Sequence, residues 1–157
     1  MHIESNIESL QTFNLNELPE LSLHLVEKAK QAADKAYAPY SGFAVGASLQ
    51  LENGEILMGN NQENVVYPAG ICAERVVMTY AHANWPELKP VKMAVVAKKK
   101  EATQYSFVTP CGICRQTIAE YERIFKSPIE IYMLIPGDRV IVAKGIDSLL
   151  PIKFSDF

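Results

Sequence analysis

The stretch FAVGASLQLENGEILMGN, residues 43–60, decides the fold expected for this chain. Its first nine residues are mostly apolar and predict a strand. Asn53-Gly54 follows and is the strongest short hairpin signal. Residues 55–60 then predict the returning strand, so the stretch is expected to form an antiparallel hairpin.

Segments with helical periodicity lie on both sides of this hairpin, and further strands follow the hairpin in the sequence. Helices are predicted over 21–37, 72–84 and 111–125. Buried or alternating strands are predicted over 93–97, 128–135 and 139–144. The first helix must end before Pro39, because proline disfavours helical geometry in the residue ahead of it. This order predicts an α/β fold, a three-layer α-β-α sandwich around a five-stranded mixed sheet.

Length and composition indicate one globular domain. The chain has 157 residues, of which 48% are hydrophobic, a size that supports a single core. We expect an N-terminal extension over residues 1–18 and one domain over 19–157. The extension has no apolar stretch of signal-peptide length, and no window approaches the roughly 18 apolar residues of a membrane span. We therefore expect a cytosolic protein without membrane contact.

The net charge argues against a polyanionic partner. Fifteen basic and eighteen acidic residues leave a formal charge of −3, which repels nucleic acid. The one basic run, Lys98 to Lys100, follows an apolar strand and is typical of a solvated strand end. No nucleic-acid partner is expected.

All three cysteines of the chain lie in two short motifs, Cys72-Ala73-Glu74-Arg75 and Pro110-Cys111-Gly112-Ile113-Cys114. Each motif stands at the expected start of a helix, where unpaired N–H groups favour a thiolate. Cys111 and Cys114 project from one face of the first turn and can bind one ion together with Cys72. Three protein ligands with one open position are typical of catalytic Zn²⁺, whereas structural zinc normally takes four.

Glu74 and Arg75 complete this arrangement. A glutamate two residues after the first ligand can carry a proton between zinc-bound water and substrate, as in the ligand-x-Glu…Pro-Cys-x-x-Cys pattern of zinc deaminases. Three thiolates weaken zinc as a Lewis acid. Arg75 is the expected cation beside the sulfurs, which would offset part of that excess charge.

Three other interpretations of these motifs were weighed. A lone Cys-x-x-Cys in the cytosol can be a redox pair. A zinc-stabilised binding module without activity would need a fourth ligand that closes the site. Deamination of nucleic acid shares the same signature, but the acidic balance argues against it.

Taken together, the motifs resemble the cytidine deaminases, in particular the small homotetrameric type with three cysteine ligands. The resemblance also includes residues 37–41, the strand 43–47, the segment Asn61-Gln62-Glu63-Asn64 with Tyr67, and the late Leu149-Leu150-Pro151. It runs from about Ala33 to Phe154. The first eighteen residues have no counterpart.

The resemblance implies zinc-dependent hydrolysis of cytidine and deoxycytidine to the uracil nucleosides and ammonia. It makes Cys72, Cys111 and Cys114 the zinc ligands and Glu74 the proton carrier. It assigns the substrate contacts to six residues: Phe43, Asn61, Glu63, Tyr67, Ala73 and Phe154. Among these, Asn61 and Glu63 would bind the ribose hydroxyls and Phe43 would lie along the pyrimidine.

The resemblance further implies a homo-oligomer, expected to be a tetramer, because Tyr67 and Phe154 match aromatics that a neighbouring subunit lends to the site. The expected partner is a small nucleoside substrate. Deamination of a different substrate, the aminonucleoside antibiotic blasticidin S, remains the nearest alternative, since that enzyme type shares both cysteine motifs. Asn61 and Glu63, together with the strand that begins at Phe43, favour cytidine.

Overall fold

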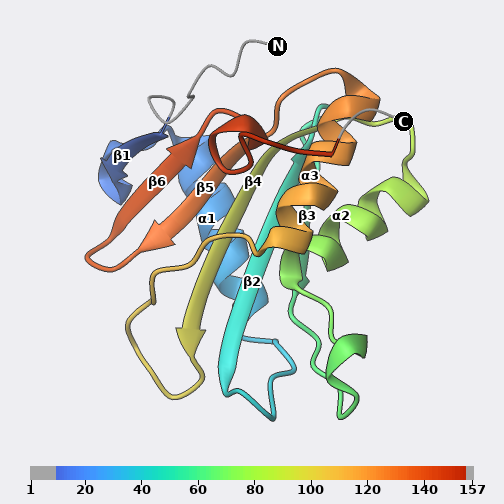
Figure 1. Cartoon of the computed structure of the whole chain (residues 1–157). Coiled ribbons are helices and arrows are strands. Elements are labelled where there is room, and N and C mark those ends of the chain that lie inside the picture. The colour runs from blue at the N-terminus through green and yellow to red at the C-terminus, as the bar shows by residue number, and fades with distance from the viewer. Residues whose placement is uncertain (1–9, 155–157) are drawn as a thin grey trace.

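The computed structural model describes residues 10–154 and shows three layers (Figure 1). A six-stranded sheet runs in the order β1-β6-β5-β4-β2-β3. Helix α1 covers one face, and α2 and α3 cover the other. The predicted α-β-α sandwich is thereby confirmed. The helices are α1 (Glu20–Ala33), α2 (Ala73–Asn84) and α3 (Gly112–Phe125).

The sheet is mixed, as predicted. Its strands are β1 (Leu10–Asn14), β2 (Phe43–Leu51), β3 (Ile56–Asn60), β4 (Pro90–Lys99), β5 (Glu130–Ile135) and β6 (Arg139–Ala143). The hairpin β2–β3 forms at Asn53-Gly54, and Gly54 adopts φ 89°, a left-handed conformation that glycine adopts without strain. Among the six strands of the described residues, β4 and β5 are the one pair that runs in parallel.

The predicted count of five strands was wrong by one. The sixth strand, β1, comes from the expected N-terminal extension and pairs antiparallel with β6, with Leu10 opposite Ala143. Phe13 packs on the core beneath α1, and the Asn14 backbone N–H donates to Glu17 to cap the next turn. The first nine residues of the extension lie outside the described residues.

Two glycines set how closely the helices approach the sheet. A Cβ on Gly46 would stand 2.0 Å from the Ala29 carbonyl oxygen of α1. A Cβ on Gly59 would stand 2.9 Å from the Ala73 carbonyl oxygen and from the Val77 nitrogen of α2. These contacts place α2 directly against β3 and so determine where the first turn of α2 lies.

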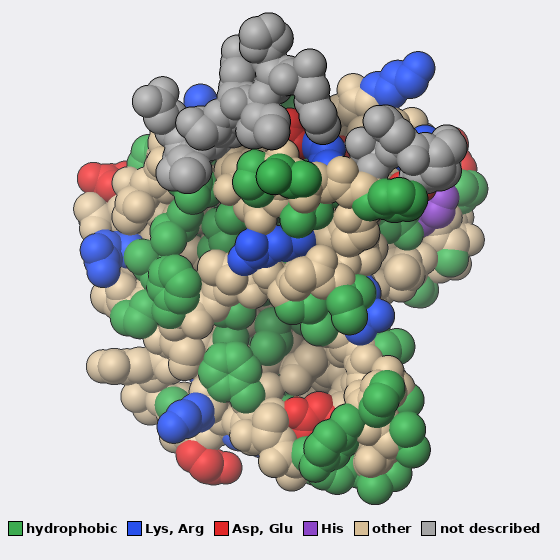
Figure 2. All heavy atoms as spheres, viewed as in Figure 1, with side chains coloured by type: hydrophobic (Ala, Val, Ile, Leu, Met, Phe, Trp, Pro, Cys, Tyr) green, Lys and Arg blue, Asp and Glu red, His purple; other side chains and the backbone are tan. Residues whose placement is uncertain are grey.

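None of the helices in the described part of the chain is long and apolar enough to cross a membrane. On the face seen in Figure 2, Lys and Arg side chains are scattered singly among acidic and apolar ones. A hollow opens below the centre of this face, with hydrophobic side chains on both sides of it (Figure 2).

Candidate metal centre and substrate cavity

The two helices on one face of the sheet bring all three cysteines together. Cys72 immediately precedes α2, Cys111 immediately precedes α3, and Cys114 lies in the first turn of α3. The Sγ atoms of Cys72 and Cys111 are 3.8 Å apart, and those of Cys111 and Cys114 are 3.5 Å apart. All three sulfurs lie within 4.8 Å of one another, so the predicted cluster forms.

These separations fit zinc and do not fit a disulfide. Four ligands about 2.3 Å from a tetrahedral zinc stand about 3.8 Å from each other, whereas bonded sulfurs are about 2.05 Å apart. Within the described residues the cluster holds three possible ligands and no fourth histidine, cysteine or carboxylate. A metal bound by the three sulfurs therefore keeps one position for water or substrate.

The local electrostatics favour a thiolate at Cys72. Hydrogen bonding with Cys114 is the main cause that lowers the pKa of Cys72, to about 5, and Arg75 contributes to this shift. The same hydrogen bonding raises the pKa of Cys114. The start of α2 adds the positive end of a helix dipole. The metal-free cluster thus loses its first proton at Cys72.

Glu74 lies in the first turn of α2, and its side chain is buried, with 4% of the residue exposed. This burial is the main cause that raises the pKa of Glu74 to about 7, and the charge on Cys72 contributes to the same shift. A carboxyl group with a pKa near neutral pH can both accept and release a proton under working conditions. Glu74 faces the cavity described next.

A cavity of about 360 Å³ opens onto the cluster. This volume suits a nucleoside-sized molecule. It is lined by Phe43, Val45, Asn61, Gln62, Glu63, Tyr67, Gly70, Ile71, Cys72, Glu74, Val108, Thr109 and Cys111. Phe43, Asn61 and Glu63 therefore line one cavity with two cysteines and the glutamate, and Tyr67, expected to be lent to a neighbouring subunit, also lines the cavity of its own chain.

The structure places the other two predicted contacts elsewhere. Ala73 is fully buried and does not line the cavity, and its carbonyl oxygen would stand 2.9 Å from a Cβ on Gly59 of β3. Phe154 is 69% exposed and lines a separate groove along α3 with Ile113 and Ile124. Within one chain, Phe154 does not line the cavity that holds Cys72 and Cys111.

Asn61 and Glu63 have structural partners of their own. The side-chain oxygen of Asn61 accepts the backbone N–H of Val45 at 2.8 Å, and its amide donates to the Phe43 carbonyl at 3.0 Å. Asn61 thereby continues the ladder between β2 and β3. One lone pair and one N–H of the amide remain beyond these two bonds.

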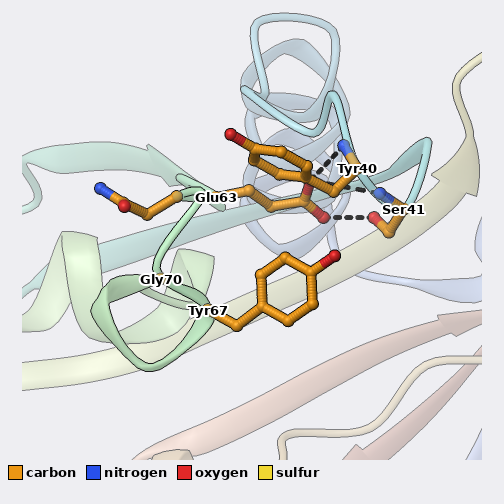
Figure 3. Close-up of a pocket in the computed structure, with 6 residues that line it drawn as sticks. Tyr40, Ser41, Glu63, Tyr67 and Gly70 are labelled. Atoms are coloured by element: carbon orange, nitrogen blue, oxygen red, sulfur yellow. Dashed lines mark hydrogen bonds between the residues drawn. The ribbon is translucent and has the colours of Figure 1, made fainter.

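The Glu63 carboxylate holds the turn before β2. It accepts the backbone N–H groups of Tyr40 at 2.8 Å and Ser41 at 3.2 Å, together with the Ser41 hydroxyl (Figure 3). The Ser41 hydrogen bond is the main cause that lowers the pKa of Glu63. Glu63 therefore stays ionised at neutral pH at the rim of the cavity.

A second cavity of about 340 Å³ adjoins the first and shares Glu63, Tyr67 and Gly70 with it. Tyr40 meets Tyr67 edge to face across it, with ring centroids 5.8 Å apart (Figure 3). Sequence reasoning named Tyr67 but missed the role of Tyr40 at this rim. Tyr40 stands in the segment 37–41, which carries part of the family resemblance.

Arg75 lies beside the cluster, as predicted. One guanidinium nitrogen donates to the Gly70 carbonyl at 3.3 Å. Its Nε is buried and has no hydrogen-bond partner in the part of the chain that the structure describes. A buried N–H without a partner is costly, and a metal-bound thiolate at Cys72 is an acceptor suited to this guanidinium.

Val108 and Thr109 also line the cavity, and sequence reasoning missed both residues. They precede the second cysteine motif in a segment, 103–111, that is neither helix nor strand. Periodicity carries no information about such a segment. The position of Thr109 directly before Pro110-Cys111 was the one available signal.

Comparison with known proteins agrees with this geometry. The family model for the cytidine and deoxycytidylate deaminase zinc-binding region matches residues 19–128. A cytidine deaminase from Halalkalibacterium halodurans is 42% identical over 132 residues, which is 83% of this chain and 92% of that protein. A blasticidin-S deaminase from Bacillus cereus is 27% identical over 148 residues, 93% of this chain and 99% of that protein. The crystal structure of a cytidine deaminase from Burkholderia pseudomallei superposes with a TM-score of 0.70 at 34% identity, covering 87% of this chain and all of that one.

Proposed function

Because this chain belongs to the cytidine and deoxycytidylate deaminase family, we propose that it hydrolyses cytidine and deoxycytidine to uridine and deoxyuridine with release of ammonia. The observation that carries the proposal is the cavity of about 360 Å³, which places two of the three clustered sulfurs and the Glu74 carboxyl at one surface. The third sulfur, on Cys114, is buried directly beneath.

Cys72, Cys111 and Cys114 are the residues that would hold Zn²⁺. When bound, zinc supplies water made acidic enough to attack C4 of the cytosine ring at neutral pH. The chain must keep this metal electrophilic although three thiolates donate charge to it. Two helix N-termini and the Arg75 guanidinium withdraw part of that charge.

Glu74 moves the protons of the reaction. It takes one proton from the attacking water and delivers it to N3 of the ring. It then takes the second proton from the hydroxyl now on C4 and delivers it to the amino group, so that the C4 carbonyl forms as the C4–N bond breaks and ammonia leaves. Water is consumed and ammonia is released, so Glu74 ends in its starting state. Burial in the cavity wall keeps its pKa near the pH at which both transfers are needed.

Glu63 and Asn61 are proposed to bind the ribose hydroxyls. The Glu63 carboxylate is already oriented by the turn at Tyr40-Ser41, and Asn61 is oriented by the β2 backbone. A carboxylate here also disfavours a phosphate on the sugar by charge repulsion. Phe43 would lie along the pyrimidine ring, since it lines the same cavity.

Tyr67 and Phe154 are proposed to complete the site of a neighbouring subunit in a homo-oligomer, with a tetramer expected. Phe154 and Tyr67 are 69% and 74% exposed in one chain, which is unusual for large aromatic side chains. We also place the protein in the cytosol, because its three cysteines are free thiols that need a reducing compartment.

Glu74→Gln tests the proposal. The amide cannot carry the proton, so kcat for cytidine is expected to fall about 10² to 10⁴-fold, while zinc content stays near that of the unaltered chain. Loss of cytidine absorbance gives the rate, and metal analysis gives the stoichiometry. Glu55→Gln, in the exposed turn of the hairpin, is the matched control. Near-normal turnover by Glu74→Gln with zinc bound would exclude Glu74 as the proton carrier.

Blasticidin S is the second substrate to assay, because the Bacillus cereus relative aligns over 93% of this chain. The ionised Glu63 and the amide of Asn61 at the rim favour a ribose over the antibiotic's sugar. A higher kcat/KM for blasticidin S than for cytidine would overturn the choice of substrate and leave the zinc chemistry in place.

A further inference from the structure

We propose that Arg115 is a positioning residue that fixes the wall of the substrate cavity and the C-terminal segment in one arrangement. The guanidinium donates from Nε to the Pro110 carbonyl at 2.8 Å, from Nη1 to the Leu149 carbonyl at 2.8 Å, and from Nη2 to the Thr109 hydroxyl at 3.2 Å. The consequence for turnover rests on the proposed function. The consequence for metal retention does not.

The contacts of Arg115 with Pro110 and Thr109 hold the cavity wall and the chain next to the metal ligand Cys111. Thr109 lines the cavity, and Pro110 immediately precedes Cys111. The segment 103–111 has no helix or strand to hold it in place, so its last residues need tethers from outside. Arg115 lies one turn into α3 and supplies two such tethers, which orients Cys111 toward the cluster.

The contact of Arg115 with Leu149 holds the C-terminal segment. Arg115 binds the Leu149 carbonyl, and its neighbour Gln116 donates from Nε2 to the Phe154 carbonyl at 3.0 Å. Two adjacent residues of α3 therefore hold two points of the segment 149–154. Phe154, proposed to reach a neighbouring subunit, is thereby tied to the helix that carries Cys114.

The chemistry of the contacts indicates positioning rather than charge pairing. All three acceptors of Arg115 are neutral oxygens, and within the described residues Arg115 belongs to no ion pair. Only a guanidinium offers a rigid planar set of donors that can reach three separate acceptors at once. A lysine ammonium keeps the charge but loses this fixed geometry.

The same helix offers a control for loss of packing alone. Glu122 accepts the backbone N–H groups of Ile129 at 2.8 Å and Ile146 at 3.0 Å. It therefore anchors the chain near Leu149 as Arg115 does, but it does not contact Thr109 or Pro110. A variant at Glu122 should weaken the fold without reshaping the cavity.

The test measures zinc release to a colorimetric chelator, kcat and KM for cytidine, and the midpoint of thermal unfolding. Arg115→Ala removes three hydrogen bonds, two of which hold the segment directly before Cys111. We expect zinc release at least about tenfold faster and a lower kcat. Arg115→Lys should give intermediate values, and Thr109→Val a smaller change in the same direction.

Gln116→Ala should raise KM about threefold or more with zinc release unchanged, because it frees only the Phe154 carbonyl. Glu122→Ala should lower the unfolding midpoint, because it removes the hydrogen bonds to the Ile129 and Ile146 N–H groups, and should leave KM and zinc release unchanged. Wild-type zinc release and wild-type kcat/KM in folded Arg115→Ala would overturn the proposal. If Arg115→Ala does not fold, wild-type values in both Arg115→Lys and Thr109→Val would do so.

Zinc release needs no turnover, so this measurement separates the two proposals. A chain that holds zinc but does not deaminate cytidine would contradict the proposed function. Faster zinc release from Arg115→Ala would still support the positioning role in that case.

Discussion

The substitution Gly59→Ala is expected to impair catalysis more than it impairs the fold. The new Cβ would stand 2.9 Å from both the Ala73 carbonyl oxygen and the Val77 nitrogen. Ordinary van der Waals contact begins near 3.4 Å, so α2 must retreat by the difference, 3.4 − 2.9 = 0.5 Å. Ala73 lies between Cys72 and Glu74, so the retreat moves a metal ligand and the proton carrier together.

A displacement of 0.5 Å is the limit that a catalytic arrangement tolerates, and 1 Å can cost about 10²-fold in rate. We therefore expect kcat/KM to fall about tenfold. The overpacking should cost about 1 kcal/mol of unfolding free energy, a small part of the 5–15 kcal/mol typical of a domain. Steady-state loss of cytidine absorbance and urea unfolding at saturating zinc measure the two effects.

Met58→Ala is the matched control, since Met58 is the neighbouring residue of β3 and is 45% exposed. Its kcat/KM should equal that of the unaltered chain. Unchanged kcat/KM and unchanged stability in Gly59→Ala would show that α2 does not approach β3 as closely as described. A loss of stability with normal catalysis would refute the link between this contact and the site.

Three further outcomes are expected. Gly46→Ala should cost more than about 3 kcal/mol, because its Cβ would stand 2.0 Å from the Ala29 carbonyl oxygen; a urea midpoint near that of the unaltered chain would contradict this. Burial raises the pKa of Glu122 above its ordinary 4.5, so Glu122 contributes most stability below pH 4.5 and that contribution is lost as the pH rises through its folded-state pKa. Zinc-saturated urea curves of Glu122→Gln, which cannot ionise, should therefore lack this decline, and parallel pH profiles would disprove it. Cys114→Ser should lose its zinc on dialysis, to well below about 0.5 ions per chain, because only two sulfurs remain; metal analysis decides.

Local signals were enough to predict most of the fold. Two of these signals, the turn at Asn53-Gly54 and the helical spacing over 72–84, depend only on residues close together in the sequence. The structure has the hairpin β2–β3 and helix α2 at these positions. Strand β1 was missed for a physical reason. It spans only Leu10–Asn14, and its partner strand ends at Ala143, so nothing near it in sequence indicates the pairing.

The candidate site also has one part that local sequence signals predict and one part that they do not. The cluster of three cysteines followed from two motifs at helix starts, because a helix start fixes where such residues point. The wall at Val108-Thr109 could not be predicted, since its position depends on contacts between distant segments, such as that of Arg115 with Leu149. Phe154 is assigned to the site by resemblance alone, and only the three-dimensional arrangement shows that within one chain it lines a different groove.

The convergence of every cysteine on one cluster gives this protein an unusually simple thiol chemistry. Its three thiols all lie within 4.8 Å of one another, so no bystander sulfhydryl contributes background to an alkylating reagent. The rate of alkylation therefore reads out directly how many molecules in a preparation lack their metal. The same proximity means that an oxidant acting on the bare cluster can join neighbouring sulfurs covalently, which would block reloading until a reductant is added.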